Sequence, residues 1–401
     1  MDAARRQAQA MKTLDELKRQ REAARDYIFP AKQLAMDATG ELILRSQKSF
    51  RVGDRVYTEW ADAEAAADES GEALESMGDT GRLALGPTAE GQLATKLGIP
   101  MSYIKRLVAG ENADLAARNF DTLLGRDNRR FLVRTLDGRI RAVLSDSYRV
   151  LDSWDLVQQA AAVFEEKQVA IWDARIADDS FYLFGVSQEV QAEVERHCEA
   201  HGPSQHAFQK FGDEAGAGEG NAPDTHYAAI RLTNSETGQG GLTVRPSILR
   251  EVCSNLMVVG DSLRQIHLGR RRSEEGLVYA DDTRQAESRA VWLKVRDTVR
   301  TVFDAAKFQE YIDQLRGQTQ VKVEEPRRSV EHIVKGADIP EASVDDIMAN
   351  FWGGRDSTGY GLVQAFTATG RDLAANDPDG AALLEETGGA IAQGKYAAAI
   401  A

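Results

Sequence analysis

Cysteine is scarce in this sequence. Only Cys198 and Cys253 occur among 401 residues. Two cysteines cannot build the disulfide framework that stabilises small secreted domains, so we expect both to be reduced, buried thiols. Because 42% of the residues are hydrophobic, a chain of this length can instead form one large or two smaller hydrophobic cores.

Long apolar runs are missing as well. No segment approaches the roughly 18 uncharged apolar residues that a membrane-spanning helix needs. The chain begins with MDAARRQAQAMKTLDELKRQREAARDY, which is charged throughout and unlike a secretory signal. We therefore predict a cytoplasmic protein without membrane contact.

Signatures of catalysis are also absent. The chain has no phosphate-binding P-loop, no G-x-S-x-G elbow and no dinucleotide fingerprint. The glycine-rich segments TGQGG and FWGGRDSTGYG do not join a clear strand to a helix, as a phosphate cradle does. Carboxylates are so abundant that no acid and base pair stands out. We predict a protein without enzymatic activity and without a cofactor.

One short segment contains four residues of the types that bind zinc. They are His197, Cys198, His201 and His206. His197 and His201 are spaced to share a helical face, as zinc ligands do. The spacing matches no compact zinc motif, however, and Gly202-Pro203 breaks the helix before His206. We therefore predict no metal site.

Positive charge is in deficit. The chain has 49 Lys and Arg residues against 63 Asp and Glu residues, for a net charge of −14. This balance argues against a surface that is basic all over. A local basic patch is still sufficient for contact with nucleic-acid phosphates, so the arginine clusters decide the question.

The pattern of apolar residues predicts an α+β fold, with twisted antiparallel hairpins packed against helices. Residues 2–26 lack Gly and Pro and carry a thin apolar stripe of Met11, Leu14 and Leu17. Such a stripe is typical of an exposed helix, either an oligomerisation arm or a solvated lead-in. Helical spacing continues from Trp292 onward. We divide the chain into an N-terminal helical arm (1–28), an α+β core domain (29–282) and a mainly helical C-terminal region (283–401).

Residues 92–107, QLATKLGIPMSYIKRL, have the spacing of a DNA-reading helix-turn-helix. Ala94, Gly98 and Ile104 occupy the small, turn and packing positions. A helical corner without DNA contact needs the same residues, and only three positive side chains lie nearby. We favour the structural corner and keep a sequence-reading repressor as a lesser alternative.

The segment RRFLVRTLDGRIRAVLSDSYRVLD predicts two strands joined by an Asp137-Gly138 turn. In this register Arg134 faces Arg141, and the basic side chains share an exposed face. Facing arginines repel unless an anion lies between them, either a DNA phosphate or a carboxylate of this chain. The expected phosphate ligands are Arg134, Arg139 and Arg141, supported by Arg130 and Arg149, with Tyr148 as a stacking surface.

A second basic cluster lies in LRQIHLGRRR. Arg270, Arg271 and Arg272 follow Arg264 and His267 there. Such a cluster suits phosphate contacts, although the acidic residues of the following SEEG segment offer neutralisation within the chain. We take Arg270, Arg271 and Arg272 as a second candidate DNA contact.

Several segments, taken in order, resemble a phage and plasmid-like protein family described as domain of unknown function 932. They are KLGIPMSYIKRL, NADLAARNFDTLL, RRFLVRTLDGRIRAVLSDSYRVLD, IRLTNSETGQGGLTVRPSILREVCSNLMV and FWGGRDSTGYGLVQAFTATGR. The likeness extends from about Tyr27 to about Arg371. Its most specific parts are Leu97 to Pro100 with Tyr103, Ser147-Tyr148-Arg149, Asn234-Ser235 and Cys253-Ser254-Asn255.

The resemblance implies a role in the DNA metabolism of mobile elements. Members often have a His-Asp-Gly-like turn after the Asn-Ser pair, where this chain has Glu236-Thr237-Gly238. A basic hairpin followed by a helix is also similar, at the level of fold, to the core of phage single-strand annealing proteins, which form rings or filaments on DNA.

These observations lead us to expect a phage or plasmid protein that binds single-stranded DNA and anneals complementary strands as a homo-oligomer. The alternative from a different class is a non-enzymatic structural oligomer that engages a phage or host protein and makes no DNA contact. A DNA-binding measurement distinguishes the two.

Overall fold

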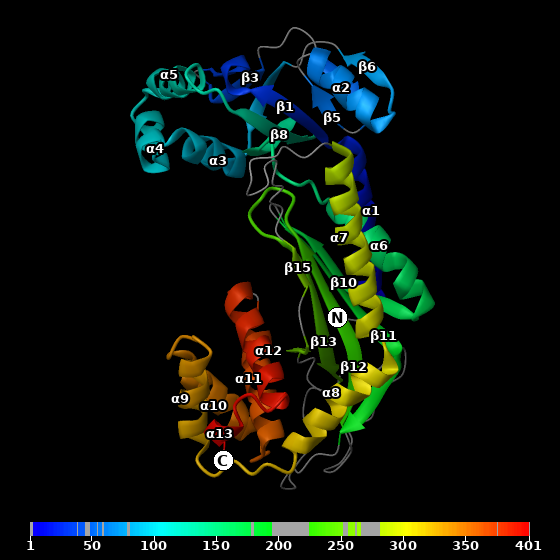
Figure 1. Ribbon diagram of the computed structural model, residues 1–401. Helices are drawn as coiled ribbons and strands as arrows, with labels where there is room; N and C mark the ends of the chain where they lie inside the picture. The colour runs from blue at the N-terminus through cyan, green and yellow to red at the C-terminus, as the bar shows by residue number, and fades with distance from the viewer. Residues whose placement is uncertain are drawn as a thin grey trace.

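The structure is a computed structural model of the chain (Figure 1). It describes residues 3–37, 39–44, 49–53, 55–57, 60–77, 81–177, 180–194, 224–251, 256–260, 263–265, 281–374 and 376–400. Two β-sheets and the helices that cover them build these parts of the chain. The α+β class expected from the sequence is therefore confirmed.

The first sheet lies at one end of the molecule (Figure 1). Its strand order is β2-β3-β7-β9-β8-β1-β5-β4-β6. The pairs β1·β5 and β7·β9 are parallel and the other pairs are antiparallel, so this sheet is mixed. The strands are β1 (Arg25–Pro30), β2 (Leu34–Met36), β3 (Glu41–Leu44), β4 (Ser49–Val52), β5 (Arg55–Tyr57), β6 (Leu74–Met77), β7 (Arg82–Leu85), β8 (Arg130–Leu136) and β9 (Arg139–Ser145).

Helices cover both faces of the first sheet. One face packs on α3 (Pro87–Leu97), α4 (Met101–Ala109) and α5 (Ala113–Leu124) through a core that includes Phe131 and Val133. The other face packs on α2 (Trp60–Ser70) through a second cluster that includes Leu132. Successive residues of a strand point to opposite faces, so Phe131, Leu132 and Val133 make the first half of β8 apolar on both sides.

The helical corner at residues 92–107 belongs to the first of these cores. Gly98 ends α3 in the left-handed conformation (φ 71°), and the N–H of Ile99 donates to the carbonyl of Ala94. Ala94 and Ile104 are buried. Lys105 and Arg106 point to solvent. The spacing that resembles a DNA-reading motif thus builds a packed corner.

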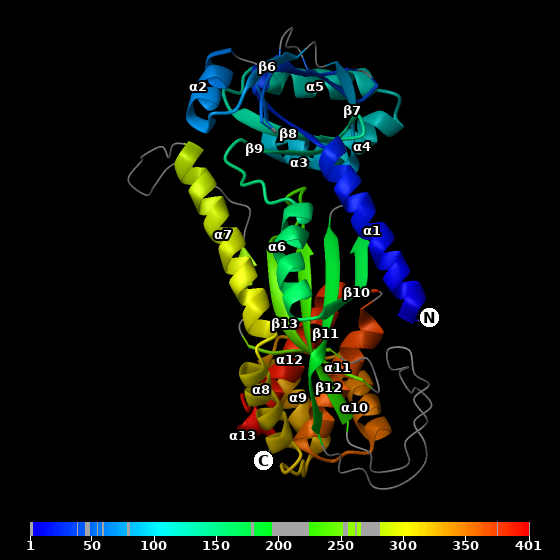
Figure 2. The same ribbon diagram turned by 90° about the vertical axis from the view of Figure 1, so that its right-hand side faces the viewer.

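The second sheet is antiparallel, in the order β10-β11-β12-β13-β14, with β15 also paired to β13. Figure 2 shows α6 lying across this sheet, with α1 and α7 on either side. The strands are β10 (Val169–Ile176), β11 (Phe181–Val194), β12 (Asp224–Asn234), β13 (Leu242–Arg250), β14 (Leu256–Val258) and β15 (Leu263–Gln265). The three helices are α1 (Ala3–Ala23), α6 (Ser153–Glu166) and α7 (Asp281–Val302).

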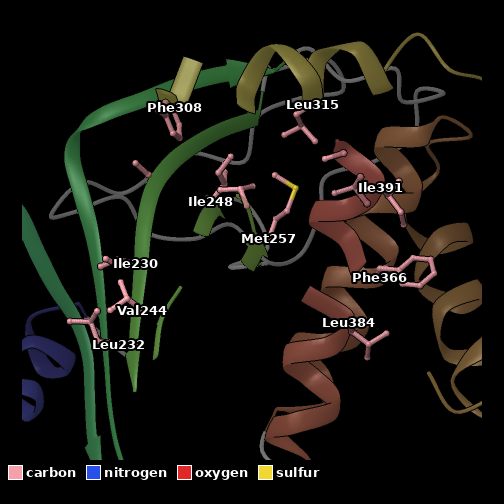
Figure 3. Close-up of a cluster of buried hydrophobic side chains, with 14 of the residues drawn as sticks. Ile230, Leu232, Val244, Ile248, Met257, Phe308, Leu315, Phe366, Leu384 and Ile391 are labelled. Carbon is pink, nitrogen blue, oxygen red and sulfur yellow. The ribbon is translucent and has the colours of Figure 1, made fainter. Parts of the chain in front are cut away.

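The C-terminal part is helical, as expected. It comprises α8 (Ala305–Gln318), α9 (Pro326–Gly336), α10 (Ser343–Gly354), α11 (Gly359–Leu373), α12 (Pro378–Ala392) and α13 (Ala397–Ile400). Figure 3 shows Met257 of β14 between Ile248 of β13 and the helix that carries Ile391. Gly389 of α12 permits this contact, because a Cβ there would lie 1.7 Å from the carbonyl oxygen of Val258. The helices and the second sheet therefore share one core.

The N-terminal helix is neither a free arm nor a solvated lead-in. Ala10, Leu14 and Leu17 are buried in the core of the second sheet, whereas Met11 is 50% exposed. After α1 the chain crosses to the first sheet and returns through α6. The boundary expected at residue 28 falls inside β1, and the region 29–282 contains two sheets with separate cores.

None of the described helices combines the length and the apolar character that crossing a bilayer requires.

Candidate functional site

The hairpin β8–β9 is present, with one difference in pairing. Asp137 (φ 49°) and Gly138 (φ 74°) form the turn in the left-handed conformation typical of tight hairpins. The register shifts between Arg134 and Thr135, which leaves Arg141 as an extra residue in β9. Arg134 therefore faces Ala142, and the expected pairing of Arg134 with Arg141 is wrong.

The expected exposed basic face of the hairpin is also wrong. Arg134 is only 1% exposed, because Asp26, Asp152 and the loop at Glu236 enclose its guanidinium. Arg130 forms an ion pair with Asp62 at 2.7 Å. Arg139 alone among the hairpin arginines points freely to solvent in the described structure. Sequence alternation cannot reveal a covered second face, which is why the expectation failed.

Three groups of the protein accept hydrogen bonds from the guanidinium of Arg134. Its Nε donates to Asp26 at 2.9 Å, and its two terminal nitrogens donate to Asp152 at 2.6 Å and to the carbonyl of Glu236 at 2.9 Å. Burial lowers the pKa of Arg134, but the charges of Asp152 and Asp26 outweigh it and raise that pKa well above its ordinary value. Burial likewise raises the pKa of Asp152, and Arg134 reverses the shift so that the pKa is lowered.

Around Arg134, a loop of the second sheet docks onto the first sheet. Glu236 accepts from the backbone N–H of Ser153 at 2.7 Å and pairs with Arg141 at 2.7 Å. Asn234 donates to the carbonyl of Leu151 at 2.7 Å. Further hydrogen bonds join Gln92 to the carbonyl of Thr237 and Tyr148 to the carbonyl of Ser235. We call this contact, residues 234–238 with Arg134, Arg141 and Asp152, the junction.

The junction explains part of the sequence pattern. Two of the most specific segments, Ser147-Tyr148-Arg149 and Asn234-Ser235, lie at or beside it. The carboxylate of Glu236 links α6 to β9. These residues hold the two sheets together.

A second buried polar network connects β12 and β13 to α11. Asp224 accepts from Arg250 at 2.7 Å and from the hydroxyl of Tyr360 at 2.6 Å. His226 lies against Tyr360 and is 1% exposed. Burial, with a further contribution from the charge of Arg250, lowers the pKa of His226 to about 4. His226 is therefore neutral at physiological pH and serves packing.

A cavity of about 590 Å³ opens beside the junction, between the first sheet and α7. Elements distant in sequence form its walls: β4 and β5, α2, the connection after β9, α6 and α7. The lining residues are Val52, Arg55, Tyr57, Ala66, Ser70, Glu72, Ser147, Tyr148, Arg149, Val150, Gln159, Glu287, Ser288, Arg289, Trp292, Leu293 and Arg296. Cavities of this size accommodate small organic ligands.

The charge of this cavity differs from that of the chain. Four arginines line it (Arg55, Arg149, Arg289 and Arg296) against two glutamates, Glu72 and Glu287. Arg149 pairs with Glu287. The Nε of Arg296 is buried without a hydrogen-bond partner, and no ion pair of Arg296 occurs among the described residues. The aromatic rings of Tyr57, Tyr148 and Trp292 share the cavity wall.

The cavity includes two of the residues predicted from the sequence and omits the others. Arg149 and Tyr148 line it, whereas Arg130, Arg134, Arg139 and Arg141 do not. Burial raises the pKa of the Tyr148 hydroxyl, which therefore stays protonated. Arg270, Arg271 and Arg272 lie outside the described residues, as do Cys198, Cys253 and the histidines considered for zinc. Within the described ranges no three side chains are placed to hold a metal ion.

Sequence reasoning missed the residues that α7 contributes. Arg289, Trp292 and Arg296 recur at helical spacing and so share one face of α7. The spacing of Trp292 with the valines at 295 and 299 instead favoured a purely apolar stripe. An alternation of basic and aromatic residues along one helix face was the available signal.

Comparison of the chain with family models, with curated proteins and with solved structures found no match. The resemblance to the phage and plasmid-like family thus stays a prediction from the sequence, and the cavity with its four arginines is the candidate functional site.

Proposed function

We propose that the protein binds single-stranded DNA in the cavity between the first sheet and α7, and that a homo-oligomer of it anneals complementary strands for a phage or plasmid. One observation carries the proposal: four arginines and three aromatic rings line a single cavity in a chain whose net charge is −14. An acidic protein that concentrates arginine in one recess creates a local attraction for anions.

The side chains suit the two parts of a nucleotide. Guanidinium groups bind phosphate oxygens through paired hydrogen bonds, so Arg149 and Arg296 are the proposed phosphate ligands. The partly exposed ring of Trp292 offers a face on which a base stacks, a contact worth about 1–3 kcal/mol per base. Stacking of this kind needs no particular base and therefore favours binding without sequence preference.

The size of the cavity favours single strands over duplexes. A volume of about 590 Å³ is in the range for one small ligand and is far too small for a base pair with its backbones. In a duplex the base faces are already stacked on one another and unavailable to protein rings. Bases outside the cavity stay free to pair, which annealing by neighbouring subunits requires.

The test is fluorescence anisotropy with a labelled oligothymidine and with a duplex of mixed sequence, across a salt series. We expect tighter binding of the single strand, with an affinity that falls steeply as salt rises. The double variant Arg149→Gln with Arg296→Gln should weaken binding at least about tenfold, because two phosphate contacts are lost.

Arg139→Gln is the matched control, since it removes an exposed arginine of the hairpin and leaves the cavity intact. Its affinity should equal that of the wild type. If Arg139→Gln lost binding and the double variant did not, the DNA site would lie on the hairpin and not in the cavity. Absence of binding to either oligonucleotide at low salt would overturn the proposal in favour of the protein-binding alternative.

A further inference from the structure

One ion pair spans the proposed DNA site. Arg149 lies in the connection between β9 and α6, and Glu287 lies near the beginning of α7. Both line the cavity and their charged groups are in direct contact. The side chain of Arg149 is 15% exposed and that of Glu287 is 40% exposed. The carboxylate of Glu287 is thus the more exposed member of the ion pair, and the guanidinium of Arg149 faces the cavity in which we propose that DNA binds.

We infer that Glu287 competes with the DNA phosphate for Arg149, so that DNA binds by exchange of one anion for another. The inference rests on the proposed function. A phosphate that reaches Arg149 must displace a carboxylate already hydrogen-bonded to it, because both anions need the same guanidinium donors. The displaced carboxylate then returns to water, which its exposed position permits.

This exchange has a measurable electrostatic signature. A free arginine attracts counter-ions to the site through its net charge, and binding to a phosphate changes the ion atmosphere of both partners. Arg149 is already neutralised by Glu287, so it contributes little to the salt dependence of binding. Removal of the carboxylate charge should raise affinity and should also steepen the dependence on salt.

The position of α7 does not depend on this ion pair. Val291, Val295 and Val299 of α7 are at most 5% exposed and anchor the helix in the core of the second sheet. A half-exposed ion pair contributes about 0–1 kcal/mol to stability, which is small beside that apolar burial. The variant Glu287→Gln should therefore fold with α7 in place.

The experiment compares Glu287→Gln with Glu72→Gln in the same oligothymidine titration. Glu72 is the other carboxylate of the cavity wall, and it has no ion-pair partner within the described part of the chain. Both variants remove one negative charge, but only Glu287→Gln removes the carboxylate that pairs with Arg149. We expect about five-fold tighter binding for Glu287→Gln and less than about two-fold for Glu72→Gln.

The salt series separates exchange from a general change in charge. The slope of log affinity against log salt should steepen by about 0.7 in Glu287→Gln, the increment for one additional phosphate contact on a single strand. The double variant Arg149→Gln with Glu287→Gln should show neither the higher affinity nor the steeper salt dependence of Glu287→Gln.

The outcomes also distinguish this inference from the proposed function. If the wild type binds and Glu287→Gln binds with equal or lower affinity, the inference is wrong and the proposed function stands. If the affinity for the oligothymidine rises equally in Glu287→Gln and Glu72→Gln, the rise reflects the change in net charge and the exchange is refuted. If neither the wild type nor Glu287→Gln binds DNA, both statements fail. Binding by Glu287→Gln alone would support both.

Discussion

The junction and the cavity are neighbours that use arginine in opposite ways. At the junction each nitrogen of the Arg134 guanidinium has a partner: two carboxylates and a carbonyl accept from a side chain that is 1% exposed. In the cavity arginines outnumber carboxylates, and no ion pair of Arg296 occurs among the described residues. The same residue type thus stabilises the fold in one place and leaves an unmet attraction for anions in the other.

A cluster of arginines in a sequence therefore does not identify a binding surface. A buried arginine pays a large desolvation cost and persists only with carboxylates around it. An arginine that retains donors and open space can accept an external anion. The partners of each guanidinium, rather than the number of arginines, separate the two regions.

The largest effect should come from breaking the junction. Arg134→Gln removes the guanidinium that pairs with Asp26 and with Asp152, and Asp152, which is 6% exposed, retains only the longer ion pair with Arg21 at 3.4 Å among the described residues. We expect a loss of about 3–5 kcal/mol in the free energy of unfolding, measured by urea denaturation. The control Arg139→Gln removes an exposed arginine and should change that free energy by less than about 0.5 kcal/mol. A loss below about 1 kcal/mol for Arg134→Gln would contradict the role of the junction.

A smaller effect should follow from acidification of the other buried network. The pKa of His226 is about 4 in the folded protein against 6.5 ordinarily. Between these values the unfolded chain binds a proton that the folded chain excludes. Stability is therefore complete above pH 6.5 and falls as pH decreases, by up to about 3 kcal/mol at pH 4.

Urea denaturation of the wild type and of His226→Gln across this range of pH measures the histidine contribution. The difference between the two proteins should change with pH in that window. The junction behaves differently, because the pKa of Asp152 is lowered in the fold and its contribution is lost only below the ordinary carboxyl range. Equal pH dependence of wild type and variant would show that His226 titrates normally.

The aromatic wall of the cavity should have an effect on binding of about ten-fold. Trp292→Leu removes the ring that we propose as a stacking face, and stacking is worth about 1–3 kcal/mol per base. Anisotropy with the oligothymidine measures the loss. Trp292→Phe keeps an aromatic face and should retain most of the affinity. Equal weakening by both substitutions would show that packing of α7, rather than stacking, is affected.

The smallest effect should be that of Arg296→Gln on stability. No ion pair of Arg296 occurs among the described residues, so the substitution breaks none there. We expect a change within about 0.5 kcal/mol in the free energy of unfolding, together with weaker DNA binding. Arg134→Gln should give the reverse pattern, since its cost lies in folding. A large loss of stability in Arg296→Gln would remove the contrast between the two regions.

Local features of the fold were predictable because they depend on neighbours in sequence. The Asp137-Gly138 turn specified the hairpin, since both residues tolerate a positive φ there. The spacing of Ala94, Gly98 and Ile104 specified the corner between α3 and α4. The helical C-terminal region followed from its periodicity.

The extra residue at Arg141 was not predictable, because a bulge leaves no mark in the alternation of apolar residues. The partners of Arg134 were equally hidden. Asp26 lies 108 residues away in the sequence and Glu236 lies 102 residues away. Similarly, α1 has the composition of an exposed helix, yet Leu14 and Leu17 are buried against the second sheet.

The α+β class, the hairpin, the corner and the net charge follow from the amino-acid sequence, since each depends on local conformational preference or on composition. Which arginines are paired inside the protein and which face a cavity depends on the folded arrangement. That arrangement depends on contacts between segments far apart in the chain, where the desolvation cost of each charge is balanced against the partners that the fold brings within reach.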